Sequence, residues 1–101
     1  MIEIMNLKKD KPKYDYDIVI DRSSEYGNPF IMKNKSYTER KRVCSLFEEY
    51  IETDTWKTKL NKLLKIYKKY GKLRLFCWCY PKKCHGNTIK RKLEELISEN
   101  N

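Results

Sequence analysis

The chain alternates between compact apolar stretches, typical of buried strands, and longer stretches with apolar residues three or four positions apart, typical of helices. Residues 14–21 have a continuous apolar centre at 18–20 and predict a strand buried on both faces. Residues 73–80 also predict a strand covered on both sides, because only Arg74 interrupts its two apolar faces. Residues 1–7 alternate for a few positions and predict an edge strand, and residues 8–13 predict an exposed linker.

Three stretches have helical spacing. Residues 38–52 place apolar side chains on one face, and Ser36 followed by Glu39 predicts a capping box at the start of this helix. Asp54 or Thr55 is expected to cap a second helix, which ends at Gly71, a residue that suits the left-handed conformation that follows many helices. A third helix covers residues 87–98.

The order of these elements predicts an α/β fold. We expect a small Rossmann-like three-layer domain with a short parallel sheet, in the order β-α-α-β-α, plus the N-terminal edge strand. The chain would form one domain over 1–101, with residues 1–13 as edge strand and linker and residues 14–98 as the α/β core. Two strands make a poor sheet, so a third must come from residues 1–7 or from a second copy in a homodimer. Parallel strands place the loops at their C-terminal ends on one rim, where we expect a common cleft.

Length and composition narrow the class of protein. A chain of 101 residues can bury about two-thirds of its surface, so it can form a core without disulfides or a metal. No segment approaches the roughly 20 apolar residues that span a bilayer, and the first residues lack the order of a secretion signal. We therefore expect a cytoplasmic protein without membrane contacts, in which the four cysteines stay reduced.

Basic residues are unevenly distributed. The formal net charge is +9, and 13 lysine or arginine residues lie between Thr55 and Lys92 without any acidic residue. Such a field attracts phosphate-bearing partners, and it indicates a nucleic-acid-binding face. The candidate residues of this face are Lys57, Lys62, Lys65, Lys68, Lys69 and Lys72. The alternative is an ordinary solvated helix face, because 18 of the 23 basic residues are lysine, as in proteins from AT-rich genomes.

The stretch LRLFCWCYPKKCHG, residues 73–86, holds three of the four cysteines and the only histidine. Thiolate and imidazole groups suit zinc, for which the candidate ligands are Cys77, Cys79, Cys84 and His85. The spacing is unfavourable, because the first two lie on a predicted strand and the last two are adjacent, so that their side chains diverge. We therefore expect no cofactor, with zinc as the alternative, and we expect the two strand cysteines to pack as small apolar residues.

Cys84 and His85 lie at the predicted start of a helix, where unpaired N–H groups and the helix dipole favour negative charge. The backbone from Cys84 to Asn87, including Gly86, would hold a phosphate or carboxylate, and the same field would lower the pKa of the Cys84 thiol. Cys84 and His85 are therefore the candidate catalytic residues. A purely structural or surface role is the alternative for His85.

The loop after the first long strand is expected to face this turn. Gly27 suits a positive φ, and Pro29 favours an extended Asn28. We expect Arg22 to bind an anion and Asn28 to contact a sugar or base edge. The complete set of predicted ligand-binding residues is Arg22, Gly27, Asn28, Pro29, Cys84, His85, Gly86 and Asn87.

Three segments, VIDRSSEYGNPF, TERKRV and LRLFCWCYPKKCHG, together resemble domain of unknown function 4326 over about residues 17–97. The resemblance implies a compact α/β domain found in bacteria, phages and large viruses, in which both loops are used together, and it brings no established activity. Its members often begin the middle helix with Ser-Arg, a place for which this chain offers Arg40 and Arg42. The last segment is also similar to domain of unknown function 488, where the earlier cysteine pair is incomplete.

Three hypotheses about function follow. The leading one is a pocket for a nucleotide or nucleoside phosphate, with nucleotide-centred hydrolysis or transfer as the chemistry in which Cys84 or His85 would take part. The second is a non-catalytic nucleic-acid-binding module that uses the lysine face and stacks bases on Tyr67, Tyr70 or Tyr80. The third is a phage or viral protein that binds a host factor in the host cytoplasm.

Overall fold

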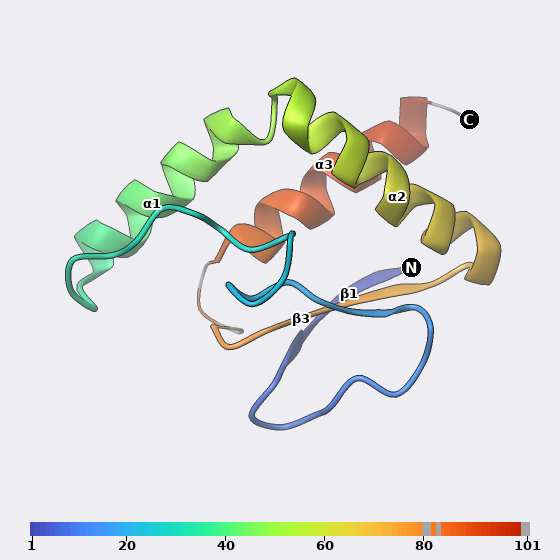
Figure 1. The fold of residues 1–101 in the computed structure, drawn as a ribbon, viewed down its shortest axis with the longest axis horizontal. Helices are drawn as coiled ribbons and strands as arrows, with labels where there is room; N and C mark the ends of the chain where they lie inside the picture. The colour runs from blue at the N-terminus through green and yellow to red at the C-terminus, as the bar shows by residue number, and fades with distance from the viewer. Residues whose placement is uncertain (80–81, 83, 100–101) are drawn as a thin grey trace.

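The computed structural model describes residues 1–79, 82 and 84–99. It has three strands and three helices in the order β1, β2, α1, α2, β3 and α3 (Figure 1). The strands are β1 (Ile2–Asn6), β2 (Asp17–Val19) and β3 (Leu73–Cys77). The helices are α1 (Tyr37–Tyr50), α2 (Asp54–Tyr70) and α3 (His85–Glu99). The predicted α/β class and element order are confirmed.

The three strands form one parallel sheet in the order β1-β3-β2. Residues 1–7 supply the third strand as predicted, because β1 pairs with β3 from Ile2 opposite Leu73 to Asn6 opposite Cys77. β3 is shorter than the predicted 73–80, since its pairing with β2 ends at Phe76 and its pairing with β1 ends at Cys77. The predicted burial of Trp78 is wrong, because this side chain lies past the paired region and is 52% exposed. The predicted strand residue 80 lies outside the described residues.

β2 is also shorter than predicted and occupies an edge of the sheet. Ile18 and Val19 are therefore only partly buried, which contradicts the expectation of burial on both faces. Ile20 follows the strand, donates its N–H to Phe76 O at 2.9 Å and is fully buried. The chain thus stays beside β3 for one residue past β2, and the loop that follows leaves from the C-terminal end of the sheet.

The helix ends follow the sequence signals in part. Ser36 caps α1 by accepting a hydrogen bond from Glu39 N, but the Glu39 carboxylate accepts from Lys33 N instead of completing the capping box with Ser36. α2 ends at Gly71 with a φ of 70°, as predicted, but the predicted cap at Asp54 or Thr55 is wrong, because the N-cap is Thr53 and Asp54 is already helical. α3 begins two residues earlier than expected, directly at His85.

One hydrophobic core joins all three helices to one face of the sheet. Figure 1 shows α1 and α2 in an arch with α3 lying between this arch and the strands. The core centres on Phe47, Trp56, Leu75 and Ile89, all without measurable exposure. Within the described residues, all three helices therefore lie on the same side of the sheet. The expected third layer is instead made by the segment between β1 and β2.

That segment covers the second face of the sheet with an aromatic and ionic cluster, which we call the Arg74 cluster: Tyr14, Tyr16, Asp17, Arg74 and Phe76. Tyr14 and Tyr16 stack at 5.1 Å between ring centroids, and the Arg74 guanidinium lies 5.3–5.8 Å from the ring centroids of Tyr14, Tyr16 and Phe76. Arg74 also donates two hydrogen bonds to the Asp17 carboxylate, at 2.6 and 2.8 Å. This pair explains how a charged residue fits on the central strand.

Candidate functional site

A pocket of about 320 Å³ opens where β2 and β3 end, between the loop after β2, the first half of α1 and the start of α3. Arg22 and His85 both line it, so the two loops meet in one cleft as the parallel strands predicted. Of the predicted ligand-binding residues, Arg22, Asn28, Cys84 and His85 line this pocket. The lining also includes Cys77 and Cys79, which were candidates only for zinc, and residues that were not predicted to contact a ligand: Asp21, Ser23, Phe30, Met32, Arg40, Val43, Cys44 and Trp78.

His85 has a structural role that sequence reasoning gave only as the alternative. Its Nε2 lies 2.7 Å from Ile20 O and 3.1 Å from Tyr26 O, and because both partners are carbonyl oxygens, Nε2 must donate. The ring is 8% exposed and packs edge-on against Phe47. Burial lowers the pKa of His85, which favours the neutral ring with its proton on Nε2. His85 therefore ties the start of α3 to the loop after β2.

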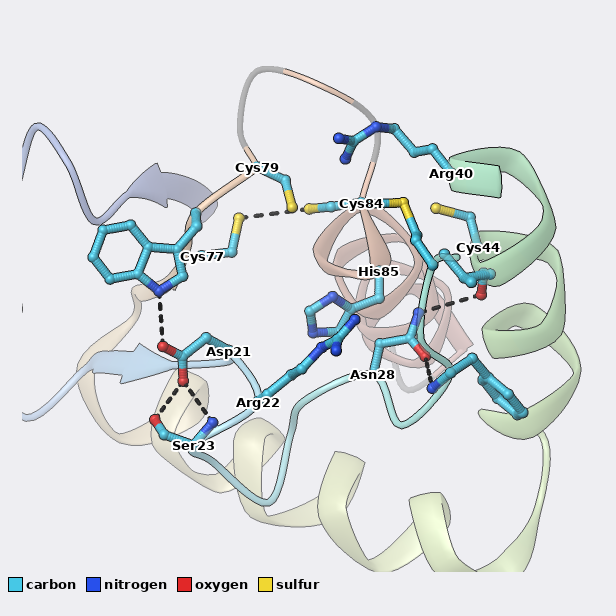
Figure 2. Close-up of a pocket in the computed structure, with 14 residues that line it drawn as sticks. Asp21, Arg22, Ser23, Asn28, Arg40, Cys44, Cys77, Cys79, Cys84 and His85 are labelled. Carbon is cyan, nitrogen blue, oxygen red and sulfur yellow. Dashed lines mark hydrogen bonds between the residues drawn. The ribbon is translucent and has the colours of Figure 1, made fainter. Parts of the chain in front are cut away.

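Three cysteine thiols gather beneath the mouth of the pocket. The Sγ atoms of Cys77 and Cys84 lie 3.5 Å apart, and Figure 2 shows the Cys79 sulfur next to that of Cys84. Cys77 and Cys84 are 2% and 3% exposed, whereas Cys79 is only half-buried. None of the four cysteines forms a disulfide bond with another described residue.

The pKa values of Cys79 and Cys84 move in opposite directions. Hydrogen bonding to Cys77 and Cys79, together with burial, raises the pKa of the Cys84 thiol, so the predicted lowering by the helix field is wrong. The hydrogen bond from Cys84 and the nearby guanidinium groups of Arg40 and Arg22 lower the pKa of Cys79 to about 6. The lowered pKa in this pocket therefore belongs to Cys79, and the sequence assigned it to Cys84 because the burial of Cys84 is not visible in the sequence.

Two arginines near the start of α1, Arg40 and Arg42, were candidates for the site, and only Arg40 lines the pocket. Arg42 hydrogen bonds to the Glu39 carboxylate at 2.8 Å and to Ile31 O at 3.0 Å, and it does not line the pocket. Arg40, two residues earlier, lines the pocket and approaches Cys79. Arg22 approaches from the loop after β2, and Figure 2 shows it reaching toward His85. Two guanidinium groups from separate elements thus face one cavity.

The carboxylate of Asp21, the one acidic residue among the described residues that line the pocket, accepts hydrogen bonds from neighbouring residues. Its carboxylate accepts hydrogen bonds from the Ser23 hydroxyl, from Ser23 N at 3.0 Å and from Trp78 Nε1 at 2.9 Å. These bonds, the Ser23 hydroxyl first, lower the pKa of Asp21, so it remains ionised. Asp21 therefore fixes the exposed indole of Trp78 at the pocket mouth.

The Gly-Asn-Pro turn shapes the pocket wall. A Cβ on Gly27 would lie 2.5 Å from Asp21 O and 2.9 Å from Arg22 Cα, so glycine is needed for this close approach; its φ is not positive, contrary to the prediction. Asn28 is buried and donates through Nδ2 to Val43 O at 3.2 Å, while its Oδ1 accepts from Phe30 N at 2.9 Å. These bonds join the loop to α1. Gly27 and Pro29 line an adjoining hollow and not the main pocket.

The predicted anion cradle at the start of α3 is already occupied by the protein. Asn87 N donates to Cys84 O and Asn87 Oδ1 accepts from Cys84 N, both at 3.0 Å. Gly86 is buried, with its Cα so close to Ile20 that an added Cβ would lie 2.9 Å from Ile20 Cδ1. Neither Gly86 nor Asn87 lines the pocket. The expected contact of an anion with this backbone therefore stays a prediction that the pocket lining does not support, and the cations that line the pocket are Arg22 and Arg40.

The zinc alternative gains no support from the part of the chain that is described, where no group of three or more His, Cys, Asp or Glu side chains is arranged to hold a metal ion. His85 Nε2 is engaged with carbonyl oxygens and cannot act as a ligand there. The four candidate ligands do cluster in space, but as a packed set of thiols beside a structural imidazole.

The predicted lysine face lies along α2 and its end. Lys57, Lys62, Lys65, Lys68 and Lys69 are exposed, and Lys72 is half-buried. Some of them have local partners: Lys62 pairs with Glu25 at 3.0 Å, and Lys72 with Glu3 at 3.7 Å. No helix in the described residues is long and apolar enough to span a membrane.

The chain matches the model of the family described as domain of unknown function (DUF4326) over residues 5–95. The match covers most of the chain, so the protein belongs to this family, as the resemblance implied. No curated protein and no solved structure matches it. The similarity of the last segment to domain of unknown function 488 stays a prediction.

Proposed function

We propose that this member of the DUF4326 family binds a small phosphate-bearing ligand, a nucleotide or nucleoside phosphate, in the pocket between Arg22 and Arg40. The observation that carries the proposal is the convergence of these two guanidinium groups, from a loop and a helix, on one cavity. Arg22 has no hydrogen-bond or ion-pair partner among the described residues. Planar guanidinium groups match the geometry of phosphate oxygens and bind them in a bidentate manner.

The walls of the pocket support a ligand with a flat apolar part. Trp78 is exposed at the mouth and held by Asp21, and Phe30 and Met32 line the interior. Aromatic side chains stack on nucleobases, and a volume of about 320 Å³ lies at the lower end of the range for small-molecule sites. We therefore expect the base against the aromatic side chains and the phosphate at the arginines.

Any nucleotide-centred hydrolysis or transfer would use Cys79, not Cys84 or His85, as its nucleophile. Cys79 is half-buried, lines the pocket and has a lowered pKa next to Arg40. Cys84 is buried with a raised pKa, and His85 donates its Nε2 proton to backbone carbonyls. A thiolate held near phosphate-binding cations suits nucleophilic chemistry on the same ligand.

The test is a thermal-shift and calorimetric panel of nucleoside mono-, di- and triphosphates and dinucleotides on the full chain. A ligand at about 100 times its Kd stabilises the folded state by about 2.7 kcal/mol, which gives a clear rise in Tm. Arg22→Met and Arg40→Met should each weaken binding at least about tenfold, or about 1.4 kcal/mol. Arg91→Met is the matched control, because Arg91 is exposed on α3 away from the pocket. A panel without any stabilising ligand at millimolar concentration would contradict the proposal.

A second candidate function is nucleic-acid binding by α2, which the exposure of five of its lysines favours. The double change Lys65→Glu with Lys68→Glu should then weaken binding of single-stranded DNA or RNA regardless of sequence, with a smaller salt dependence. The same double change should leave a nucleotide complex in the pocket intact. Affinity that does not fall with salt would exclude this candidate.

A further inference from the structure

We propose that Cys79 and Cys84 form a peroxide-oxidised dithiol, in which Cys79 is the site of oxidation and Cys84 is the resolving thiol. This inference concerns a modification of the protein and needs no ligand in the pocket. It therefore stands or falls separately from nucleotide binding.

The first step of the argument is the packing of the sulfur atoms. Cys84 Sγ lies 3.5 Å from Cys77 Sγ, and the Cys79 thiol lies beside it in the lining of the same pocket (Figure 2). Figure 2 shows the Cys79 and Cys84 side chains meeting from opposite ends of the loop that follows β3. A thiol next to another thiol can replace the oxygen of an oxidised sulfur without a large rearrangement of the chain.

The second step is the difference between the two sulfurs. Cys79 is half-buried and lines the pocket, so a small oxidant can reach it, whereas Cys84 is 3% exposed. Arg40 from α1 and Arg22 from the loop after β2 both place positive charge near Cys79. Those charges stabilise a thiolate, the form that peroxides oxidise. An accessible thiolate beside a buried thiol is the arrangement of a redox-sensitive cysteine with its resolving partner.

The proposed reaction takes two steps. The Cys79 thiolate attacks one oxygen of hydrogen peroxide, an S–O bond forms, the O–O bond breaks, and the departing hydroxide takes up a proton to become water. Cys84 Sγ then attacks the Cys79 sulfenic acid, an S–S bond forms, the S–O bond breaks, and the hydroxide leaves with the Cys84 proton as a second water. Two thiols are oxidised and one peroxide is reduced. A dithiol reductant reverses the bridge by thiol exchange.

The test uses the reduced full chain treated with a small excess of hydrogen peroxide and followed by intact mass. We expect the protein to lose two thiols and about 2 Da, for two hydrogen atoms, with peptide mapping placing the bridge between Cys79 and Cys84. Dithiothreitol should restore the original mass. Cys79→Ser should slow thiol loss at least about tenfold, while Arg91→Met, an exposed position on α3 away from the pocket, should keep the rate of the unaltered protein.

A second variant separates the two steps. In Cys84→Ser the sulfenic acid cannot be resolved, so dimedone should label Cys79 and no bridge should form. Peptide mapping of the unaltered protein gives the same answer if Cys84→Ser does not fold. The proposal is overturned if Cys79→Ser is oxidised as fast as the unaltered protein, or if the bridge joins Cys77 to Cys84 without Cys79. It is equally overturned if peroxide leaves all thiols intact.

Discussion

Two groups of charged residues lie at different parts of the sheet, the Arg74 cluster on its second face and the pocket residues where β2 and β3 end, and their arginines have different neighbours. In the Arg74 cluster the cation meets a carboxylate, and Asp17 further accepts hydrogen bonds from Lys13 N at 2.8 Å and Tyr14 N at 3.1 Å. In the pocket, Arg22 and Arg40 instead face a thiol, and Asp21 is bound to Ser23 and Trp78. The first cluster satisfies its charges within the protein. The second places two guanidinium groups at a cavity, where Arg22 is exposed.

This difference shows which charges of the chain serve the fold and which are available for function. Charged groups that are buried without a partner are costly, so a protein keeps them only with a counter-ion, with solvent access or with a ligand. Arg74 has its counter-ion, and its side chain is only 16% exposed. Arg22 is exposed at the pocket. Three substitutions test this contrast, ordered by the expected loss of stability.

Arg74→Met should have the largest effect on stability. It keeps the apolar stem of the side chain but leaves the Asp17 carboxylate, whose side chain is 0% exposed, without its cation. Removing one partner of a buried ion pair costs about 3 kcal/mol. Urea unfolding at neutral pH would measure this loss, with Arg91→Met as the control, whose exposed pair should change stability by no more than about 0.5 kcal/mol.

The Arg74–Asp17 pair should also make the stability of the protein depend on pH in acid. The Arg74 hydrogen bond lowers the pKa of Asp17 from 3.8 to about 2 in the folded state. The ionised pair therefore contributes its full stability above pH 3.8, and this contribution is lost as the pH falls toward about 2. The Arg74→Met protein should show a smaller decline over this range, because its Asp17 has lost the main cause of the lowered pKa. An equal decline in both proteins would show that the pair is not a structural support.

His85→Ala should have the next largest effect, about 2 kcal/mol, because it removes the donor from two carbonyl oxygens and leaves a cavity beside Phe47. His85→Gln provides a matched comparison, since its side-chain amide can donate from nearly the same place and should restore part of the loss. Chemical denaturation without any ligand measures both variants. If His85→Ala were as stable as the unaltered protein, His85 would be free for the catalytic role that the sequence predicted.

The contrast between the clusters also explains how much the sequence could predict. Periodicity located all six elements, and the parallel order of strands placed Arg22 and His85 at one pocket, since these follow from short-range patterns and topology. The role of Cys84 was not predictable, because Cys79 and Cys84 differ by burial and by the approach of Arg40 from a helix distant in sequence. Neither the burial of a cysteine nor the approach of a distant arginine can be predicted from the spacing of nearby residues.

The first turn of α3 is a second example of a site that the sequence alone could not predict. A cysteine, a histidine and a glycine before a helix are typical of an anion site, but Asn87 satisfies the Cys84 backbone and Gly86 packs on Ile20. Similarly, the sequence did not distinguish Arg40 from Arg42, and the structure does: Arg42 pairs with Glu39, whereas Arg40 lines the pocket. Competing partners inside the protein decide which polar groups remain for a ligand.

Of the three substitutions, Arg40→Met should change the stability of the protein least and the reactivity of the Cys79 thiol most. It removes one of the two cations that hold the pKa of Cys79 near 6, so the pKa should rise toward the ordinary value of 9.0. Iodoacetamide labelling of Cys79, followed by peptide mass against pH, measures the shift. The unaltered protein should approach its full rate near neutral pH, whereas Arg40→Met should react several-fold more slowly there and reach its full rate only at higher pH.

Arg42→Met is the control for this experiment, because Arg42 lies two residues away on the same helix and pairs with Glu39 outside the pocket. It should leave the labelling profile of Cys79 unchanged, although it too removes one positive charge. A shift of equal size in both variants would mean that the thiol responds only to the overall charge of the protein. A shift confined to Arg40→Met would instead locate the effect in the pocket, where Arg40 lies near the Cys79 thiol.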